Sequence, residues 1–107
     1  MVTVLTNDNF AAETASTDMP VLVDCYADWC GPCKMMAPLV EKMSELFEGK
    51  LKVCKINVDD NEEAIAPFRV MSIPTFLFFK NGELVSTKVG GMDPGTFQQA
   101  INEVLAM

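Results

Sequence analysis

The sequence predicts an α/β fold in which a central mixed sheet of five strands is flanked by about four helices. Short apolar runs alternate with helical patterns along the 107 residues, as in sheets covered by helices on both faces. Asn81-Gly82 separates two strand-like runs, 75–80 and 83–89, and this dipeptide is the strongest short hairpin signal. An antiparallel pair is therefore expected at one side of the sheet, within a single domain spanning residues 1–107.

The first part of the chain is expected to form a strand, a short helix and a second strand. Residues 2–5 alternate as a strand does, and Asn7 or Asp8 can cap a helix over 9–14. Residues 20–27 form a nearly continuous apolar run. That pattern predicts a strand buried on both faces, as inner strands of parallel sheets are.

A long helix is expected over 32–47, with a kink at Pro38 and a C-terminal stop at Gly49. Residues 51–58 follow as another buried strand, which predicts a right-handed parallel crossover. The helix should bury one face, formed by apolar residues at helical spacing: Met35, Met36, Leu39, Val40, Met43, Leu46 and Phe47.

Two shorter helices complete the expected elements. One covers about 61–66 and is ended by Pro67. The last begins with Asp93 as N-cap and Pro94 in the first helical position. Its apolar stripe consists of Phe97, Ala100, Ile101, Val104 and Leu105.

Charge and hydropathy narrow the class of function. The formal net charge is −7, so nucleic acid is not an expected partner. No apolar run approaches the roughly 18 residues of a membrane helix, and no basic segment precedes the first strand, so neither a membrane span nor a signal peptide is expected. We therefore expect a cytoplasmic, reducing compartment, where a cysteine pair indicates redox or metal chemistry rather than a disulfide framework.

Cys30-Gly31-Pro32-Cys33 stands between the apolar strand and the long helix. Thiols at this spacing can close and open a disulfide, and a helix N-terminus lowers the pKa of a thiol. Gly31 permits a partner backbone to come close, and Pro32 suits the first helical turn. The alternative is half of a zinc site, but zinc usually takes four ligands, and the chain has no histidine and no second such pair. No metal is expected.

Asp24 and Lys55 place charges inside apolar strands. Burial of a carboxylate should raise the pKa of Asp24, and a base with a pKa near the working pH suits proton transfer. From the residues alone, Asp24 is equally a buried carboxylate that only satisfies local hydrogen bonds. Lys55 is equally a lysine whose ammonium extends to water.

The segment Val23-Asp24-Cys25-Tyr26-Ala27-Asp28-Trp29-Cys30-Gly31-Pro32-Cys33-Lys34 resembles the thioredoxin family. The resemblance extends over essentially the whole chain, through Pro38, Lys55, Ile73-Pro74-Thr75, Phe79-Lys80-Asn81-Gly82 and Val89-Gly90-Gly91. Three positions depart from the family pattern: Tyr26 stands where tryptophan is usual, Cys25 where phenylalanine is frequent, and Arg69 where glycine is common.

The resemblance implies the thioredoxin fold and a general protein-disulfide reductase without a bound cofactor. Cys30 would attack the target disulfide, Cys33 would resolve the mixed disulfide, and Asp24, with Lys55 as its partner, would accept a proton from Cys33. The implied partners are disulfide-containing target proteins and an upstream thioredoxin reductase, with the protein acting as a monomer. Targets would dock on Trp29, Gly31, Pro32, Ile73, Pro74, Val89, Gly90 and Gly91. Pro74 stands at the position of the family's cis-proline, but X–Pro bonds are trans by default and the sequence does not fix the isomer of this one.

Two other classes of function are the alternatives. The fold can serve as a redox-dependent binding module or subunit, which intact cysteines do not exclude. An oxidase or isomerase is less favoured, because Gly31-Pro32 places no charged residue or histidine between the cysteines to stabilise the thiolate further.

Cys25 and Cys54 lie in the middle of strands and are expected to be inert core residues. If Asp24 and Lys55 share one face of the sheet, strand alternation places both cysteines on the opposite face, so an accessory redox pair is the alternative. The eight methionines are expected to fill the core.

Overall fold

A computed structural model describes all residues, 1–107, and has the predicted mixed sheet flanked by helices. The sheet order is β1-β3-β2-β4-β5; β3 is parallel to β1 and β2, whereas β4 is antiparallel to β2 and β5. The elements in chain order are β1 (Thr3–Leu5), α1 (Phe10–Ala15), β2 (Val21–Tyr26), α2 (Gly31–Leu46), β3 (Lys52–Asn57), α3 (Glu62–Ile65), the 3-10 helix η1 (Ala66–Phe68), β4 (Thr75–Lys80), β5 (Glu83–Val89) and α4 (Pro94–Leu105).

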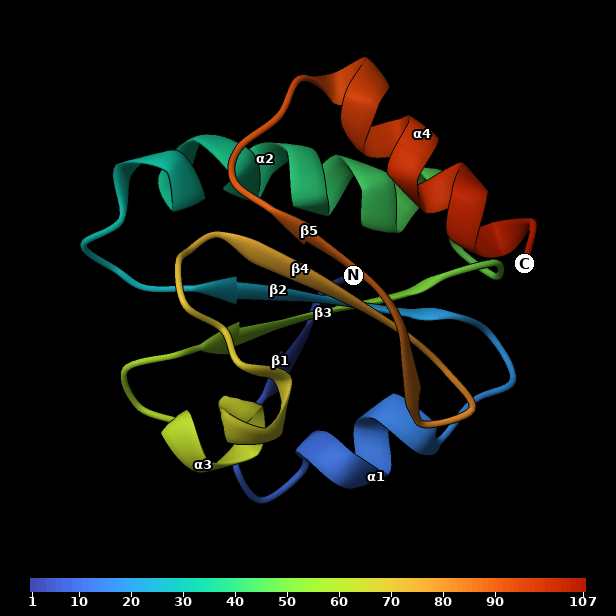
Figure 1. Ribbon diagram of the computed structural model, residues 1–107. Coiled ribbons are helices and arrows are strands. Elements are labelled where there is room, and N and C mark those ends of the chain that lie inside the picture. The colour runs from blue at the N-terminus through green and yellow to red at the C-terminus, as the bar shows by residue number, and fades with distance from the viewer.

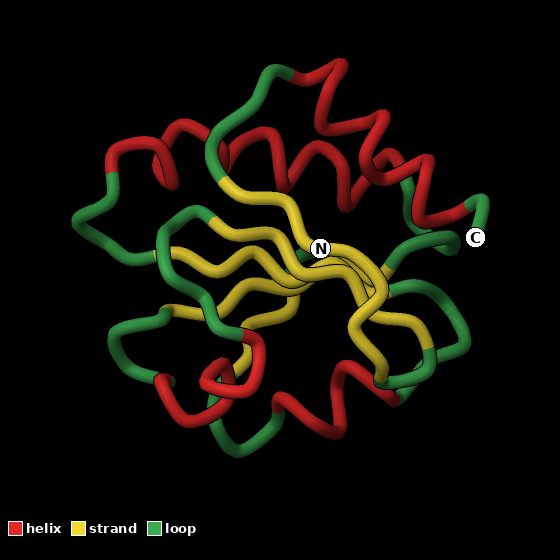
Figure 2. Tube along the Cα trace, in the orientation of Figure 1, coloured by secondary structure: helices red, strands yellow, loops and turns green.

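Helices cover both faces of the sheet. In Figure 1, α2 and α4 lie over one face, and α1 and α3 lie over the other. Figure 2 shows the strands as one band between these two layers. Each layer encloses its own apolar cluster, and Phe76, Phe78 and Phe97 belong to the cluster beneath α2 and α4. The alternating strand residues thus supply two cores rather than one.

Strand β2 occupies the centre of the sheet, between β3 and β4. Its residues from Val21 to Cys25 are all buried, including the charged Asp24. This matches the expectation from the apolar run at 20–27. Because the carboxyl end of β2 leads directly into the Cys30 turn and α2, the cysteines lie where the central strand ends.

The buried face of α2 is narrower than the sequence predicted. Met36, Val40 and Met43 are buried, but Met35 is 82% exposed and Leu46 is 55% exposed. Neighbouring helix residues are rotated by about 100° from one another. Because Met36 faces the sheet, the adjacent Met35 points away from it. In the same way, Phe47 is buried and the adjacent Leu46 is exposed.

The expectation that all methionines fill the core was also wrong. Met71 is 91% exposed, and Met1 and Met107 at the chain ends are exposed as well. Burying a methionine requires a gap in the packing, and Met71 belongs to neither of the two large apolar clusters, since it is the adjacent Val70 that packs against one of them.

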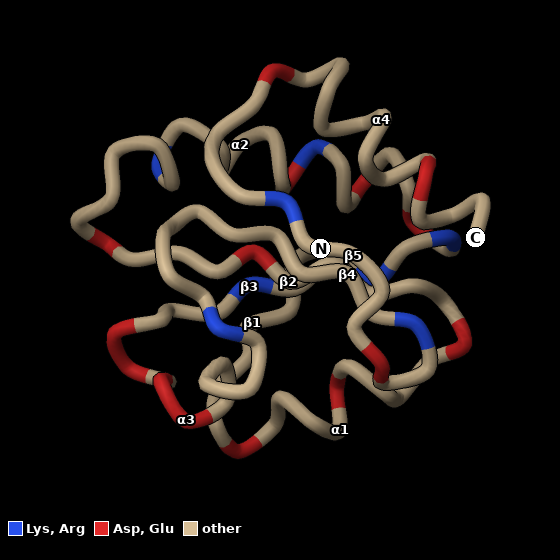
Figure 3. The backbone as a smooth tube through the Cα atoms, viewed as in Figure 1, with Lys and Arg blue, Asp and Glu red and all other residues tan.

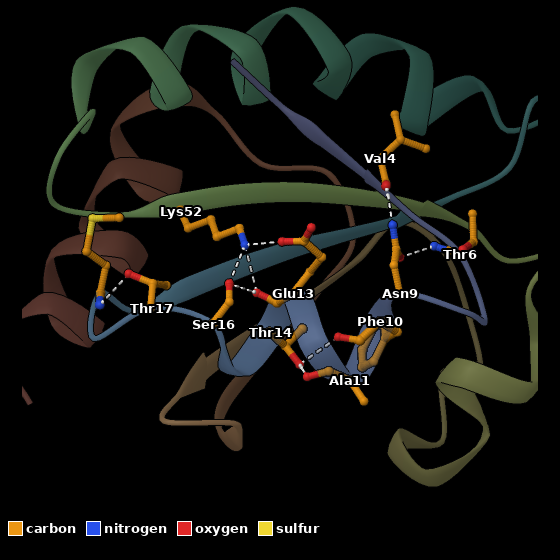
Figure 4. Close-up of polar contacts among 11 residues, drawn as sticks. Val4, Thr6, Asn9, Phe10, Ala11, Glu13, Thr14, Ser16, Thr17 and Lys52 are labelled. Atoms are coloured by element: carbon orange, nitrogen blue, oxygen red, sulfur yellow. Dashed lines mark hydrogen bonds and ion pairs between the residues drawn. The ribbon is translucent and has the colours of Figure 1, made fainter.

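One of two predictions at helix ends was wrong. Neither Asn7 nor Asp8 caps α1: Asn9 stands at the N-cap, and its side chain bridges Thr6 and Val4 instead of capping the helix (Figure 4). The helix predicted at about 61–66 is confirmed as α3: it ends at Ile65 with Ala66 as its C-cap, directly before Pro67, which lies in the first turn of η1, where no backbone N–H is needed.

The predicted hairpin and the start of the last helix are confirmed. Asn81 and Gly82 both have positive φ, +53° and +81°, which is the type I′ geometry of tight hairpins. The Asp93 side chain accepts a hydrogen bond from the N–H of Thr96 at 2.8 Å and so caps α4.

Lys52 joins β3 to the end of α1 (Figure 4). Its ammonium donates to the Glu13 carbonyl at 2.8 Å and to Ser16 Oγ at 2.9 Å, and it also pairs with the Glu13 carboxylate. A cation at a helix C-terminus satisfies carbonyls that have no partner within the helix. Lys52 therefore holds α1 against the sheet.

We expect Lys52→Met to lower the free energy of unfolding by about 1 kcal/mol, since the pair is partly exposed and most of the loss comes from the hydrogen bonds. Urea unfolding followed by circular dichroism measures this change. Lys50→Met is the matched control, because Lys50 is exposed and makes no side-chain hydrogen bond or ion pair. An equal loss in both variants would show that removing positive charge, rather than the link to α1, is responsible.

Candidate functional site

Cys30 and Cys33 form a disulfide across the first turn of α2, with their Cα atoms 5.2 Å apart. Cys30 is the N-cap of the helix, and Pro32 lies in the first turn. The backbone N–H of Cys33 donates to Cys30 Sγ at 3.2 Å. A sulfur in this position receives both a hydrogen bond and the positive end of the helix dipole, which favour its thiolate.

The two cysteines differ in their surroundings rather than in their exposed area. Each is 4% exposed in this disulfide state. The difference lies in what each contacts. Cys30 Sγ lies 3.9 Å from the Ile73 carbonyl oxygen on the outer side of the turn, whereas Cys33 lines a cavity that continues inward to Asp24.

This inner cavity, of about 170 Å³, brings together residues from β2, β3 and α2. Asp24 on β2 lies beside Lys55 on β3 in the sheet register. The cavity is large enough to admit water between the Cys33 sulfur and the Asp24 carboxyl. Its lining consists of Asp24, Tyr26, Ala27, Asp28, Cys33, Lys34, Ala37 and Lys55.

Asp24 is a buried carboxyl without a hydrogen-bond partner. It is 4% exposed, and its Oδ1 atom is completely buried and unpaired. Burial raises its pKa to about 7, and the positive charge of Lys55 opposes part of that rise. The ammonium of Lys55 makes no ion pair with Asp24, since the single ion pair in the structure joins Lys52 and Glu13. Asp24 can therefore take up or release a proton near neutral pH.

The segments expected to dock a target meet around Cys30. The Ile73-Pro74 peptide bond is cis, as the resemblance implied. The N–H of Gly90 donates to the Pro74 carbonyl at 2.8 Å, which ties the end of β5 to the loop before β4. Gly91 lies against the ring of Pro32, where an added Cβ would be 4.0 Å from Pro32 Cβ. Residues separated by more than 60 positions thus form one surface.

Two apolar hollows flank this surface. One has a volume of about 590 Å³ and lies between the start of α2 and the loop before α4, lined in part by Pro32, Met35 and Met92. The other, of about 360 Å³, is lined in part by Trp29, Met71 and Ile73. These methionines were not predicted to be surface residues. Met35 and Met71 lie within two or three residues of Cys33 and of Pro74, and Met92 directly follows Gly91, and these placements were the available signal.

Trp29 is 70% exposed, and its indole N–H donates to Asp59 Oδ2 at 2.8 Å. Asp59 was not predicted as a site residue. It lies two residues after the end of β3, at the edge of the sheet where β2 also ends, so its position in the sequence could have indicated it. Acidic positions follow one another along the segment from β3 into α3 (Figure 3). This side of the site is therefore negatively charged.

Cys25 and Cys54 share the face opposite Asp24, as alternation predicted, but they form no disulfide. Both are completely buried, and in the register Cys54 lies beside Val23 while Cys25 lies beside Ile56. Burial raises the pKa of Cys25 to about 12 and that of Cys54 to about 11. These protonated, inaccessible thiols belong to the core.

No three side chains of histidine, cysteine, aspartate or glutamate come together in an arrangement that could hold a metal ion. None of the helices combines the length and the apolar character required to cross a membrane.

Comparison with known proteins agrees with the geometry. A model of the thioredoxin family matches residues 1–103. The chain is similar to thioredoxin of Porphyra purpurea, 41% identical over 98% of each chain, and to thioredoxin of Haemophilus influenzae, 44% identical over 89% of each. Thioredoxin of Rickettsia felis is 41% identical over 96% of this chain and 98% of its own. These matches favour a reductase over the binding-module alternative. With its dithiol–disulfide pair at the start of α2, the chain belongs to the thioredoxin family, and it is a thiol–disulfide oxidoreductase that reduces protein disulfides.

Proposed function

We propose that Cys30 is the nucleophile and Cys33 the resolving cysteine of this reductase. The observation that carries the assignment is the hydrogen bond from the Cys33 N–H to Cys30 Sγ at the N-cap of α2. That donor stabilises negative charge on Cys30 in particular. Cys33 lies one turn further inside and faces the Asp24 cavity, where a proton acceptor is available.

The reaction then has two exchange steps. The Cys30 thiolate attacks one sulfur of the target disulfide, the target S–S bond breaks, and one target thiolate leaves. Cys33 loses its proton and attacks Cys30 Sγ, so that the mixed disulfide breaks and the second target thiolate leaves and is protonated. The target gains two electrons, and the Cys30–Cys33 disulfide of the structure is formed.

Asp24 is the proposed proton acceptor for Cys33. Its carboxyl lines the same cavity as Cys33 and has a pKa of about 7, so its ionised form can accept a proton at neutral pH. Lys55 is its proposed partner, acting through its charge from the neighbouring strand because no ion pair joins the two. Water in the cavity is the proposed path of the proton.

Target docking is assigned to the surface around Cys30. An extended target segment would lie against Pro74 and the free backbone near Gly91, with apolar side chains entering the two methionine-lined hollows. The residues proposed to contact the target are Trp29, Gly31, Pro32, Ile73, Pro74, Val89, Gly90 and Gly91. All of them except Ile73, Pro74 and Gly90 are exposed.

The family implies disulfide-containing target proteins and a thioredoxin reductase that returns two electrons to the Cys30–Cys33 disulfide. We further propose that the chain acts as one domain and as a monomer, in the cytoplasm, and needs no bound cofactor. The match of the family model to residues 1–103 supports one domain, and the dithiol by itself supplies the electrons that the reaction requires.

Substitution of each cysteine separates their roles. Wild type should reduce the interchain disulfides of insulin, whereas Cys30→Ser and Cys33→Ser should both be inactive. Cys33→Ser alone should accumulate a covalent adduct with the target, because its Cys30 can attack but nothing resolves the product. Mass spectrometry under non-reducing conditions detects the adduct. Catalytic turnover by Cys30→Ser would contradict the assignment.

Asp24→Asn tests the buried carboxyl by stability and by rate. The folded pKa of about 7 exceeds the unfolded value of about 3.9, so the unfolded chain loses this proton first and the contribution of Asp24 to stability falls as pH rises between these values. Asp24→Asn should thus be more stable than wild type by about 2–4 kcal/mol near pH 8, with little difference near pH 4.

The same variant should resolve the mixed disulfide about 100-fold more slowly at neutral pH, because the general base is missing. Rapid-quench measurement of target release after mixed-disulfide formation isolates this step. An unchanged rate of release would remove Asp24 from the mechanism, whatever the stability measurements show.

Substitutions at Gly91 test docking. Its backbone needs no positive φ and an added Cβ would make only ordinary contact with Pro32, so Gly91→Ala and Gly91→Val should fold normally. The larger side chain should hold the target backbone away and raise KM for a protein substrate by about tenfold, with alanine intermediate. The rate with a small disulfide such as lipoamide is the control. Equal losses with both substrates would place the effect on the cysteines instead of on docking.

A further inference from the structure

The Lys55 ammonium does not pair with the neighbouring carboxyl of Asp24. Asp24 and Lys55 are neighbours in the register of β2 and β3, yet their charged groups are not within ion-pair distance. The Nζ atom instead lies over the ring of Tyr26, 5.7 Å from its centroid. That distance is typical of a cation held by an aromatic face.

Strand geometry explains how Tyr26 can take the ammonium. Tyr26 is two residues beyond Asp24 on β2, so both side chains lie on the same face of the sheet as Lys55. Tyr26 is paired in the register with Asn57, two residues beyond Lys55 on β3. A lysine extending toward the carboxyl ends of the strands therefore meets the Tyr26 ring, whereas one extending sideways meets Asp24.

The ring, rather than the hydroxyl, makes this contact. The Tyr26 hydroxyl forms no hydrogen bond. Burial, followed by the negative charges of Asp28, Asp24 and Asp60, raises the pKa of Tyr26, so its ring stays neutral in the working range. A ring face is sufficient to attract the cation, and phenylalanine offers nearly the same face.

We propose that Tyr26 is a positioning residue whose ring holds the Lys55 ammonium away from Asp24, so that the buried carboxyl has no ion-pair partner and remains free to exchange a proton with Cys33. The inference rests on the proposed role of Asp24. It gives a function to one of the three positions at which this chain departs from the family pattern.

The unpaired state of Asp24 is an independent observation that favours this role. Asp24 Oδ1 is buried and has no hydrogen-bond partner, although a lysine is its register partner on β3. A direct ion pair would favour the ionised carboxylate and make it a weaker base. The charged and titratable groups that face Asp24 are Tyr26 and Asp28 at the end of β2, Lys55 on β3, and Cys33 and Lys34 on α2, whereas β4 contributes the uncharged Phe76.

Substitution of the ring tests the proposal through the titration of Asp24. The protein is kept in its disulfide state, so that neither Cys30 nor Cys33 titrates, and carboxyl ¹³C shifts are followed by NMR. Tyr26→Met keeps an apolar side chain of similar length without a ring, and Tyr26→Leu serves if that variant does not fold. We expect the Asp24 pKa to fall by about one unit, a tenfold change in the ratio of protonated to ionised carboxyl, while Tyr26→Phe leaves it unchanged.

Repeating the titration in a Lys55→Met background separates two effects of losing the ring: movement of the Lys55 ammonium and entry of water beside Asp24. Loss of the ring could also admit water to Asp24 and lower its pKa without any movement of Lys55. In Lys55→Met, the pKa of Asp24 should rise, and adding Tyr26→Met should then cause no fall. A fall of equal size in both backgrounds would overturn the proposal, and so would an unchanged pKa in Tyr26→Met alone.

The titration also keeps this proposal distinct from the proposed function. It reports where Lys55 acts, whether or not Asp24 takes part in catalysis. The functional readout is the rate at which wild type and Tyr26→Met resolve the mixed disulfide, measured across pH. We expect the acidic limb of this rate profile to shift to lower pH by the same one unit. If Asp24→Asn resolves the mixed disulfide at the wild-type rate, the function of Asp24 fails while the titration result stands.

Discussion

Strand β2 lies between β3 and β4, and helices cover both of its faces. Every other part of the site depends on this burial. Burial of β2 requires apolar residues on both of its faces and raises the pKa of Asp24, the one carboxyl on the strand. The end of this buried strand leads into the N-terminus of α2. The redox pair lies at that junction, where backbone N–H groups face Cys30.

The cost of burying Asp24 is also the source of its usefulness. A carboxyl in this position loses hydration on folding, and the neighbouring positive charge of Lys55 recovers only part of that loss. The sheet could have neutralised it with a direct ion pair, but the ammonium lies over the Tyr26 ring instead. Burial of Asp24 thus lowers the stability of the fold but gives the carboxyl a pKa at which it can exchange protons near neutral pH. Strongly shifted pKa values are concentrated at functional sites in the same way.

Much of the fold and part of the site could be predicted because their causes are local. The strands at 75–80 and 83–89 follow from their apolar residues and from Asn81-Gly82, and Asp93 caps the last helix as expected. Other predictions were wrong where neighbours compete for one position. Met35 and Met36 could not both face the sheet, and α1 begins after Asn9, whose side chain bonds to Thr6 and Val4 and leaves the helix without a side-chain cap.

The sequence by itself determined the cysteine pair, the helix that begins between its two members, the charges within the central strands and the family to which they belong. These features depend on residue type and short spacing. Only the tertiary structure decided that Lys55 lies over Tyr26, that Asp59 accepts the Trp29 indole N–H, that the Ile73 carbonyl lies beside Cys30 and that Gly91 lies against Pro32. The physical reason is that such contacts join segments tens of residues apart, so strand order and register must be set before any of these side chains can meet.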